Sequence, residues 1–330
     1  MRLSISFMGI SPIDSTLPAV RAAERFGLDG VWSAEHIGFH DAIVPTALYL
    51  RETERLEVAV VGISTAGRHP GLIAMELSSL AELGPGRVRV QVGTGDPSLI
   101  AKLGKELARP ARSTAELVQA LRGALAGEEM DIEHPAFAFR GFKVNPLAPP
   151  PAVDVMAVRP LMVRTAARVG DGLSISMAAS QAYIADTVRD VESELETQGR
   201  DRTSFRISAV ALGVIAEDLE TASASAAPLF TIFDPPMLEY LARGVIEPGA
   251  LVEAAEAGGT PAALQILTPE VVAGIALAAT PEQLGAALES YAATGIDELA
   301  VSIFAAPEEQ AAIVEQLAAT RPARAASDAR

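Results

Sequence analysis

The chain contains no cysteine among its 330 residues, which excludes disulfide bonds and thiolate metal sites. Aromatic residues make up only 5%, and the four histidines show no metal-ligand spacing, so we expect no metal. Positive charge is scarce too, because 26 basic against 42 acidic residues give a net charge of -16. An acidic chain is repelled by phosphate backbones, which disfavours nucleic acid as a partner.

Long apolar runs are also missing. No uninterrupted stretch approaches the roughly 18 residues of a membrane helix. The first residues, MRLSISF, predict a strand rather than a signal peptide. We therefore expect a cytoplasmic protein that works without a membrane.

Strand patterns alternate with helical patterns along nearly the whole chain, which is typical of a parallel α/β architecture. Eight strands are predicted, namely Leu3–Phe7, Gly30–Ala34, Leu56–Gly62, Val88–Val92, Val153–Val158, Leu173–Ser176, Phe205–Ile215 and Glu298–Phe304. Eight strands with their helices favour a (β/α)8 TIM barrel over an open sheet, although the order of elements alone is compatible with both.

Two segments exceed a minimal barrel, which we otherwise expect to be one domain over residues 1–320. After the fourth strand, the proline-rich stretch His134–Pro151 carries an apolar–polar alternation consistent with an insertion hairpin. After the seventh, Ala216–Thr280 predicts a helical excursion that covers the site or forms an oligomer contact. Residues 321–330 are polar and alanine-rich, so we expect a disordered tail.

The third and fourth strands end in small residues, Gly62-Ile63-Ser64 and Gly93-Thr94-Gly95-Asp96. Parallel α/β folds bind ligands at the carboxyl ends of their strands. Glycine lets the backbone approach a ligand closely, and a threonine hydroxyl can donate a hydrogen bond. For Gly62 the residues alone favour the simpler interpretation, a strand-to-loop turn.

Two further strand ends carry polar residues. Glu35 and His36 follow the second strand, where a histidine is as consistent with a packed barrel-mouth residue as with an acid–base group. Val158 and Arg159 lie at the end of the fifth strand, just before a helix. Free amides and the dipole at a helix start bind phosphate, but a surface arginine at a helix cap is an equal alternative.

The order and spacing of these motifs resemble the luciferase-like monooxygenases and the related oxidoreductases of the deazaflavin coenzyme F420. The resemblance spans nearly the whole chain. It includes AERFGLDGVWSAEH, Arg68-His69-Pro70 at the start of a helix, the Gly-Thr-Gly loop, Gly170-Asp171-Gly172 and TPEQLGAALESYAATGIDELAVSIF.

This resemblance implies an F420-dependent oxidoreductase that moves a hydride between C5 of the deazaflavin and a small organic substrate. The implied acid–base residues are His36 and Asp96, and the implied cofactor contacts are Glu35, Gly62, Ile63, Ser64, Gly93, Thr94, Gly95, Val158 and Arg159. It also implies a bulge with a non-proline cis peptide at Gly62–Ile63, and a homodimer. Asp96 replaces the more usual glutamate, and Arg159 stands where a small residue is usual.

Two alternatives remain open. One is an FMN-dependent monooxygenase or flavin reductase of the same fold, and the other is a non-catalytic barrel that binds a flavin-like ligand. A nicotinamide-dependent dehydrogenase is disfavoured because no G-x-G-x-x-G follows the first strand.

Overall fold

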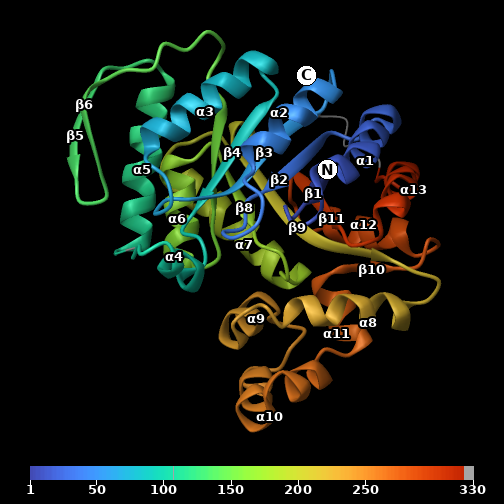
Figure 1. Ribbon diagram of the computed structural model, residues 1–330. Coiled ribbons are helices and arrows are strands. Elements are labelled where there is room, and N and C mark those ends of the chain that lie inside the picture. The colour runs from blue at the N-terminus through green and yellow to red at the C-terminus, as the bar shows by residue number, and fades with distance from the viewer. Residues whose placement is uncertain (107, 323–330) are drawn as a thin grey trace.

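The computed structural model describes residues 1–106 and 108–322. Eight parallel strands pair in the order β9-β11-β1-β2-β3-β4-β7-β8, and β8 pairs again with β9. This pairing closes the sheet and confirms the predicted (β/α)8 barrel (Figure 1). The strands are β1 Arg2–Phe7, β2 Gly30–Ala34, β3 Glu57–Ser64, β4 Val88–Gly93, β7 Ala152–Met156, β8 Gly172–Ile175, β9 Arg206–Ile215 and β11 Glu298–Ile303.

Helices surround the barrel and cover its outer face (Figure 1). They are α1 Ile13–Phe26, α2 Ile43–Glu52, α3 Pro70–Leu83, α4 Pro97–Lys102, α5 Pro110–Leu125, α6 Pro160–Val169, α7 Gln181–Thr197, α12 Leu284–Ala292 and α13 Pro307–Ala319. The first helix ends at Gly27, which adopts the left-handed conformation with φ 78°. The sequence did not predict α2 or the short helix α4.

An antiparallel hairpin lies outside the barrel. It consists of β5, Met130–His134, and β6, Phe137–Phe142, so its first strand begins before the stretch in which the hairpin was expected. The side chain of His69 holds it to α3. Its Nε2 donates to the carbonyl of Ala138 at 2.9 Å while Nδ1 accepts from the Gly71 amide at 3.0 Å. The histidine of the Arg-His-Pro motif is therefore a structural clamp.

The segment between β9 and α12 forms a helical lobe below the barrel in Figure 1. It contains α8 Leu219–Phe230, α9 Pro235–Leu241, α10 Ala250–Ile266, α11 Pro269–Ile275 and the unpredicted strand β10, Leu277–Ala279. The short strand pairs in parallel with the last residues of β9. The non-helical backbone angles of Gly259 bend α10. The extent of the domain, residues 1–320, stays a prediction.

Arg321, which follows the last helix, lies at the amino-terminal end of the barrel. Arg321 donates to the carbonyl of Gly27 at 3.1 Å and pairs with Asp29. Residues 323–330 of the predicted disordered tail lie outside the described residues. Over the described ranges, no helix has both the length and the apolar character needed to cross a membrane.

The barrel interior changes character along its axis. At the amino ends of the strands, the buried carboxylate of Glu298 accepts from Ser4 at 2.6 Å and from Trp32 at 3.2 Å, and pairs with Arg206 at 3.0 Å. Asp154 binds Arg89 through both of its oxygens. Above these ion pairs lies an apolar cluster that includes Trp32, Val61 and Ala300. Buried charges are thus paired and sealed at the end opposite the predicted ligand site.

Candidate active site at the carboxyl ends of the strands

Four predicted motifs end on strands that are neighbours in the sheet, in the order β2-β3-β4-β7. The predicted bulge in β3 is present, since the register with β4 shifts between Val61 and Ile63. Gly62 forms it with φ 85°. A Cβ on Gly62 would lie 2.9 Å from the carbonyl oxygen of Glu35, so only glycine fits this contact between two strand ends.

The predicted cis peptide at Gly62–Ile63 is wrong, because the described residues contain no cis peptide bond. The physical reason is the glycine itself. A left-handed residue absorbs the extra position of the bulge while its peptide bonds stay trans. The wall formed by Gly62, Ile63 and Ser64 is therefore shaped by one φ angle rather than by a cis bond.

Glu35 is fixed at the end of β2 from two sides. Its amide donates to the carbonyl of Val61 at 2.8 Å, and its carboxylate lies 2.8 Å from a guanidinium nitrogen of Arg68. Arg68 also faces Glu76 at 3.8 Å. Burial raises the pKa of Glu76, and Arg68 offsets part of that rise. Arg68 therefore lies between two carboxylates, those of Glu35 and Glu76, and offsets their negative charge.

The role of Arg68 was missed at the sequence level, where Arg-His-Pro served only as a family marker. The signal was its position. An arginine between a strand end and the start of the next helix is long enough to reach back to the neighbouring strand end. The structure uses that reach to hold Glu35.

His36 is exposed at the rim, and one of its ring nitrogens is engaged. Nδ1 lies 2.8 Å from the carbonyl oxygen of Met8, in the loop that follows β1. A carbonyl only accepts hydrogen bonds, so Nδ1 carries the proton in this contact. The neutral ring then presents Nε2 as an acceptor, which is the arrangement a proton-exchanging histidine needs.

The loop after β4 packs against the β3 bulge. Ser64 donates to the carbonyl of Thr94 at 3.1 Å, and a Cβ on Gly95 would lie 3.0 Å from the Ser64 hydroxyl oxygen. Gly93 is equally tight, since a Cβ there would lie 3.1 Å from Cβ of Met156 on β7. The glycines therefore bring three neighbouring strand ends close together, and Thr94 is half-exposed above them.

Asp96 caps the short helix α4. One carboxylate oxygen accepts from the Ser98 amide at 2.7 Å, the Ser98 hydroxyl at 2.6 Å and the Leu99 amide at 3.2 Å. These bonds, that of the Ser98 hydroxyl first, lower the pKa of Asp96. A carboxylate held ionised accepts protons poorly and has none to donate near neutral pH. Its catalytic role stays a prediction.

Arg159 stands before the first residue of α6, and no side chain caps that helix start. Its guanidinium lies 4.0 Å from the ring centre of Tyr240, on α9 of the helical lobe. Among the described residues no carboxylate pairs with Arg159. Its positive charge and the uncapped amides of α6 therefore face the same strand end.

Two tyrosines at this end were not predicted from the sequence. The hydroxyl of Tyr183, on α7, donates to the carbonyl of Val158 at 2.5 Å. Burial raises the pKa of Tyr183 to about 12, so it stays a donor. Tyr183 and Tyr240 also pack edge to face with ring centres 5.7 Å apart. These contacts tie the helical lobe to the end of β7, and no local sequence pattern indicates such a pairing.

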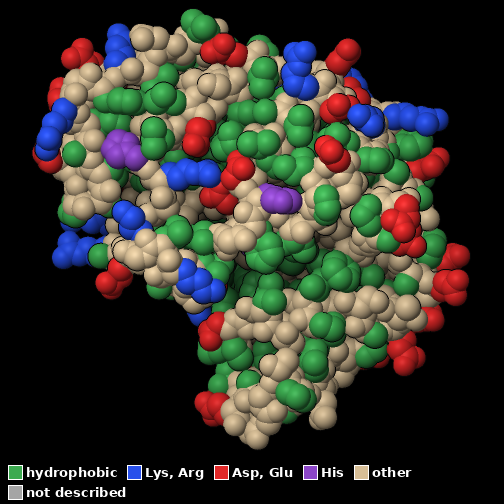
Figure 2. All heavy atoms as spheres, viewed as in Figure 1, with side chains coloured by type: hydrophobic (Ala, Val, Ile, Leu, Met, Phe, Trp, Pro, Cys, Tyr) green, Lys and Arg blue, Asp and Glu red, His purple; other side chains and the backbone are tan. Residues whose placement is uncertain are grey.

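Figure 2 shows the surface hollowed between the barrel and the helical lobe, with hydrophobic side chains gathered in the hollow. A family model described as luciferase-like monooxygenase matches residues 4–298. The chain belongs to this family.

Two sequence relatives and one solved structure show what this chain is similar to. A 5,10-methylenetetrahydromethanopterin reductase of Methanolobus tindarius is 24% identical over 307 residues, covering 91% of this chain and 93% of the relative. An F420-dependent glucose-6-phosphate dehydrogenase of Beutenbergia cavernae is 30% identical over 183 residues, covering 50% and 53%. The solved F420-dependent tetrahydromethanopterin reductase of Methanopyrus kandleri superposes with TM-score 0.81 at 15% identity, covering 96% and 97%.

In this luciferase-like barrel, the predicted site residues lie at or near the carboxyl ends of neighbouring strands. Glu35, the β3 bulge and the β4 glycine loop are in direct contact with one another. Val158 and Arg159 join them through Met156, the last residue of β7, against which Gly93 packs. His36 lies at the rim beside Met8. The structure therefore gathers the predicted residues at one end of the barrel, although it gives Asp96 a capping task.

Proposed function

We propose that this protein is an F420-dependent oxidoreductase that transfers a hydride between the deazaflavin and an organic substrate. One observation carries the proposal: the neighbouring strand ends of β2, β3, β4 and β7 combine a glycine-shaped wall with an uncapped helix start and an unpaired arginine. The printed names of the relatives from Methanolobus and Beutenbergia, a methylenetetrahydromethanopterin reductase and an F420-dependent dehydrogenase, point to the same chemistry.

The donor set suits such a cofactor. A flat ring needs a wall without protruding side chains, and Gly62, Gly93 and Gly95 provide backbone at the places where a Cβ would collide with a neighbour. A phosphate needs amide donors and positive charge, which the α6 start and Arg159 provide. The residues therefore fit F420, with Thr94 as a hydroxyl donor beside the ring.

When bound, F420 supplies C5 as the hydride donor or acceptor. The residues of this chain have other tasks. Arg68 holds Glu35 at the edge of the wall, and the Met8 carbonyl holds His36 with Nε2 available for a proton. We assign the proton transfer to His36, because the hydrogen bonds of Asp96 keep that carboxylate ionised.

The decisive experiment is to titrate the purified chain separately with F420 and with FMN, then to follow oxidation of reduced F420 over a panel of carbonyl and methylene-pterin acceptors. We expect F420 to bind more tightly and to be oxidised by at least one acceptor. Tight FMN binding without F420 binding would favour the FMN-dependent alternative. Binding of reduced F420 without turnover by any acceptor would favour the non-catalytic barrel.

We also propose that the protein is a homodimer through α2 and α3. These helices pack side by side, and their outer faces expose Val44, Leu48, Leu72 and Met75, each between 36% and 55% accessible. A contiguous apolar patch is typical of an interface. A second copy of so acidic a chain would approach most easily through an uncharged face. Sedimentation of the Leu72→Glu variant as a monomer, against a wild-type dimer, tests this. The cytoplasmic location stays a prediction.

A further inference from the structure

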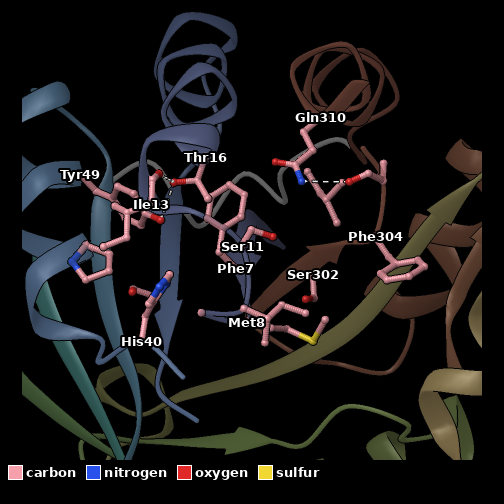
Figure 3. Close-up of a pocket in the computed structure, with 16 residues that line it drawn as sticks. Phe7, Met8, Ser11, Ile13, Thr16, His40, Tyr49, Ser302, Phe304 and Gln310 are labelled. Carbon is pink, nitrogen blue, oxygen red and sulfur yellow. Dashed lines mark hydrogen bonds between the residues drawn. The ribbon is translucent and has the colours of Figure 1, made fainter. Parts of the chain in front are cut away.

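A small cavity lies beside the proposed active site, on the far side of the loop that follows β1. Its volume is about 100 Å³. Figure 3 shows side chains from four regions converging on it: Phe7 and Met8 at the end of β1, Thr16 on α1, Tyr49 on α2, and Gln310 on α13. The size admits a group of a few heavy atoms, since sites for drug-sized ligands measure about 300 to 1,000 Å³.

The cavity wall contains one buried acceptor without a donor. Gln310 is 4% exposed, and its amide nitrogen donates to the Ala305 carbonyl at 3.2 Å. Its amide oxygen has no hydrogen-bond partner among the described residues. In Figure 3 this oxygen is turned away from the carbonyl that the nitrogen binds. An unpaired buried acceptor is costly, and at Gln310 the adjoining cavity leaves room for a ligand that brings a donor.

The other polar side chains of the wall are hydroxyls, apart from that of His40. Thr16 donates to the Ile13 carbonyl at 2.7 Å, so the Tyr49 hydroxyl, 2.8 Å from the Thr16 oxygen, is the donor in that pair. Burial raises the pKa of Tyr49 to about 12, which keeps it neutral. Ser33 adds a hydroxyl that is 3% exposed, and the lining contains no Lys, Arg, Asp or Glu. A charged ligand would therefore find no carboxylate, ammonium or guanidinium group in this wall.

The cavity shares one wall with the active site. Met8 lines the cavity, and its carbonyl accepts the hydrogen bond from His36. The backbone of His40, also in the lining, donates to the carbonyl of Gly9 at 3.1 Å. A group bound in the cavity therefore touches the same loop that orients the proposed proton-carrying histidine.

We propose that this cavity binds a small uncharged group carrying a hydrogen-bond donor, a hydroxyl or a primary amide, with Gln310 as its acceptor. The group belongs to an organic molecule bound beside the deazaflavin. This assignment of the group rests on the proposed function, whereas binding of the group itself does not. Gln310, from the last helix of the barrel, thereby determines which uncharged ends are accepted.

The test uses acetamide as the probe and acetate as its charged counterpart of the same shape. Ligand-observed NMR titration of the cofactor-free protein should show millimolar binding of acetamide and none of acetate. Gln310→Leu should weaken acetamide binding about tenfold, the effect of one lost hydrogen bond. A structure of the acetamide-soaked crystal should place the amide nitrogen against Gln310.

The matched control is Gln316→Leu. Gln316 is on the same helix and also has a buried amide oxygen without a partner among the described residues, but it does not line the cavity. Its variant should bind acetamide as the wild type does. Equal binding by the Gln310 and Gln316 variants, or binding of acetate as tight as that of acetamide, would overturn the proposal. The acetate comparison needs no variant, so it stands even where Gln310→Leu folds poorly.

A second experiment tests whether the bound group belongs to F420 itself or to another molecule. The acetamide titration is repeated with F420 bound, and we expect both to bind together, as a site beside the cofactor requires. Displacement of acetamide by F420 would assign the cavity to the cofactor and contradict the proposal. Failure of F420 to bind at all would count against the proposed function and leave the cofactor-free acetamide result standing.

Discussion

The two ends of this barrel use polar residues in opposite ways. At the amino ends of the strands, Glu298 and Asp154 are buried and each is paired with an arginine, and Glu298 also accepts a hydrogen bond from Ser4. At the carboxyl ends, Arg159 has no carboxylate partner among the described residues, and Gln310 has an unpaired oxygen. The comparison teaches that one end pairs its buried carboxylates with arginines of the same chain, which serves stability, whereas the other leaves a charge and an amide oxygen for a ligand.

The largest effect is expected from a substitution at the amino ends of the strands. Glu298→Gln removes the charge that Arg206 and Arg2 face, and unpairing a buried ion pair costs about 3 kcal/mol or more. Urea unfolding measures this loss, with the exposed Glu315→Gln on α13 as control, which should change stability by less than about 0.5 kcal/mol. F420 affinity of the folded fraction should not change. A stability loss no larger than that of the control would contradict the comparison.

The same carboxylate sets a pH dependence. Burial alone would raise the pKa of Glu298, but Arg206, Arg2 and the Ser4 hydroxyl hold it below its ordinary value. A carboxylate whose pKa is lowered by folding stabilises the folded protein at pH values above its unfolded-state pKa. This stabilisation is lost as the pH falls through the folded-state pKa. The stability difference between wild type and Glu298→Gln should therefore shrink below about pH 4. A stability difference that grows as the pH falls would contradict a lowered pKa of Glu298 in the folded protein.

His36→Asn tests the open end at its proposed chemical step. Loss of a general acid–base group lowers turnover by about 100-fold or more, while the free energy of unfolding should stay within about 0.5 kcal/mol because the residue is exposed. Oxidation of reduced F420 with the best acceptor of the panel measures the first quantity, and urea unfolding the second. Unchanged turnover would remove His36 from the mechanism.

Arg159→Gln tests the unpaired charge. Loss of a charge-assisted hydrogen bond to the cofactor phosphate should weaken F420 binding by about 10- to 100-fold. Arg164→Gln on the same helix is the matched control, because Arg164 is exposed and lies beyond the helix start. Similar affinities for the two variants would mean that Arg159 only stacks on Tyr240.

Gly62→Ala, at the carboxyl end of β3, and Gly86→Ala, before the amino end of β4, compare the two ends of the barrel directly. Both glycines have positive φ, 85° and 74°, but a Cβ on Gly62 collides with Glu35 whereas one on Gly86 meets nothing within 4 Å. Backbone strain alone costs about 1–2 kcal/mol in each variant. Only Gly62→Ala should also weaken F420 binding. If Gly86→Ala weakens it equally, the β3 bulge has no special place in the site.

The smallest effect is expected at Asp96. Asn is as good a helix cap as Asp, so Asp96→Asn should change neither stability nor turnover near neutral pH beyond about twofold. Turnover as a function of pH checks this. A drop comparable to that of His36→Asn would restore Asp96 as a catalytic residue.

Local patterns predicted the barrel because each strand and helix carries its own signal. The apolar run Gly30–Ala34 has the predicted bounds. The resemblance suggested both a bulge and a cis bond at Gly62–Ile63, and the structure has the bulge without the cis bond. A glycine with φ 85° accommodates the bulge while its peptide bonds stay trans.

Pairings between distant residues could not be predicted. Arg159 meets Tyr240 across 81 positions of the chain, and Gln310 reaches a cavity lined by Phe7 and Tyr49. Such contacts depend on the closure of the barrel and on how the helical lobe folds back. No periodicity or spacing in the sequence encodes them, and only the structure shows which polar groups stay unpaired.

The most direct test of the central claim is a crystal structure of the protein with F420 bound. We predict that the deazaflavin ring contacts the Gly62–Ser64 wall and Thr94, and that the phosphate binds at Arg159 and the start of α6. The amino end, with Glu298 and its arginines, should stay free of ligand. F420 bound elsewhere on the molecule, or a carboxyl end without ligand at saturating F420, would contradict the account.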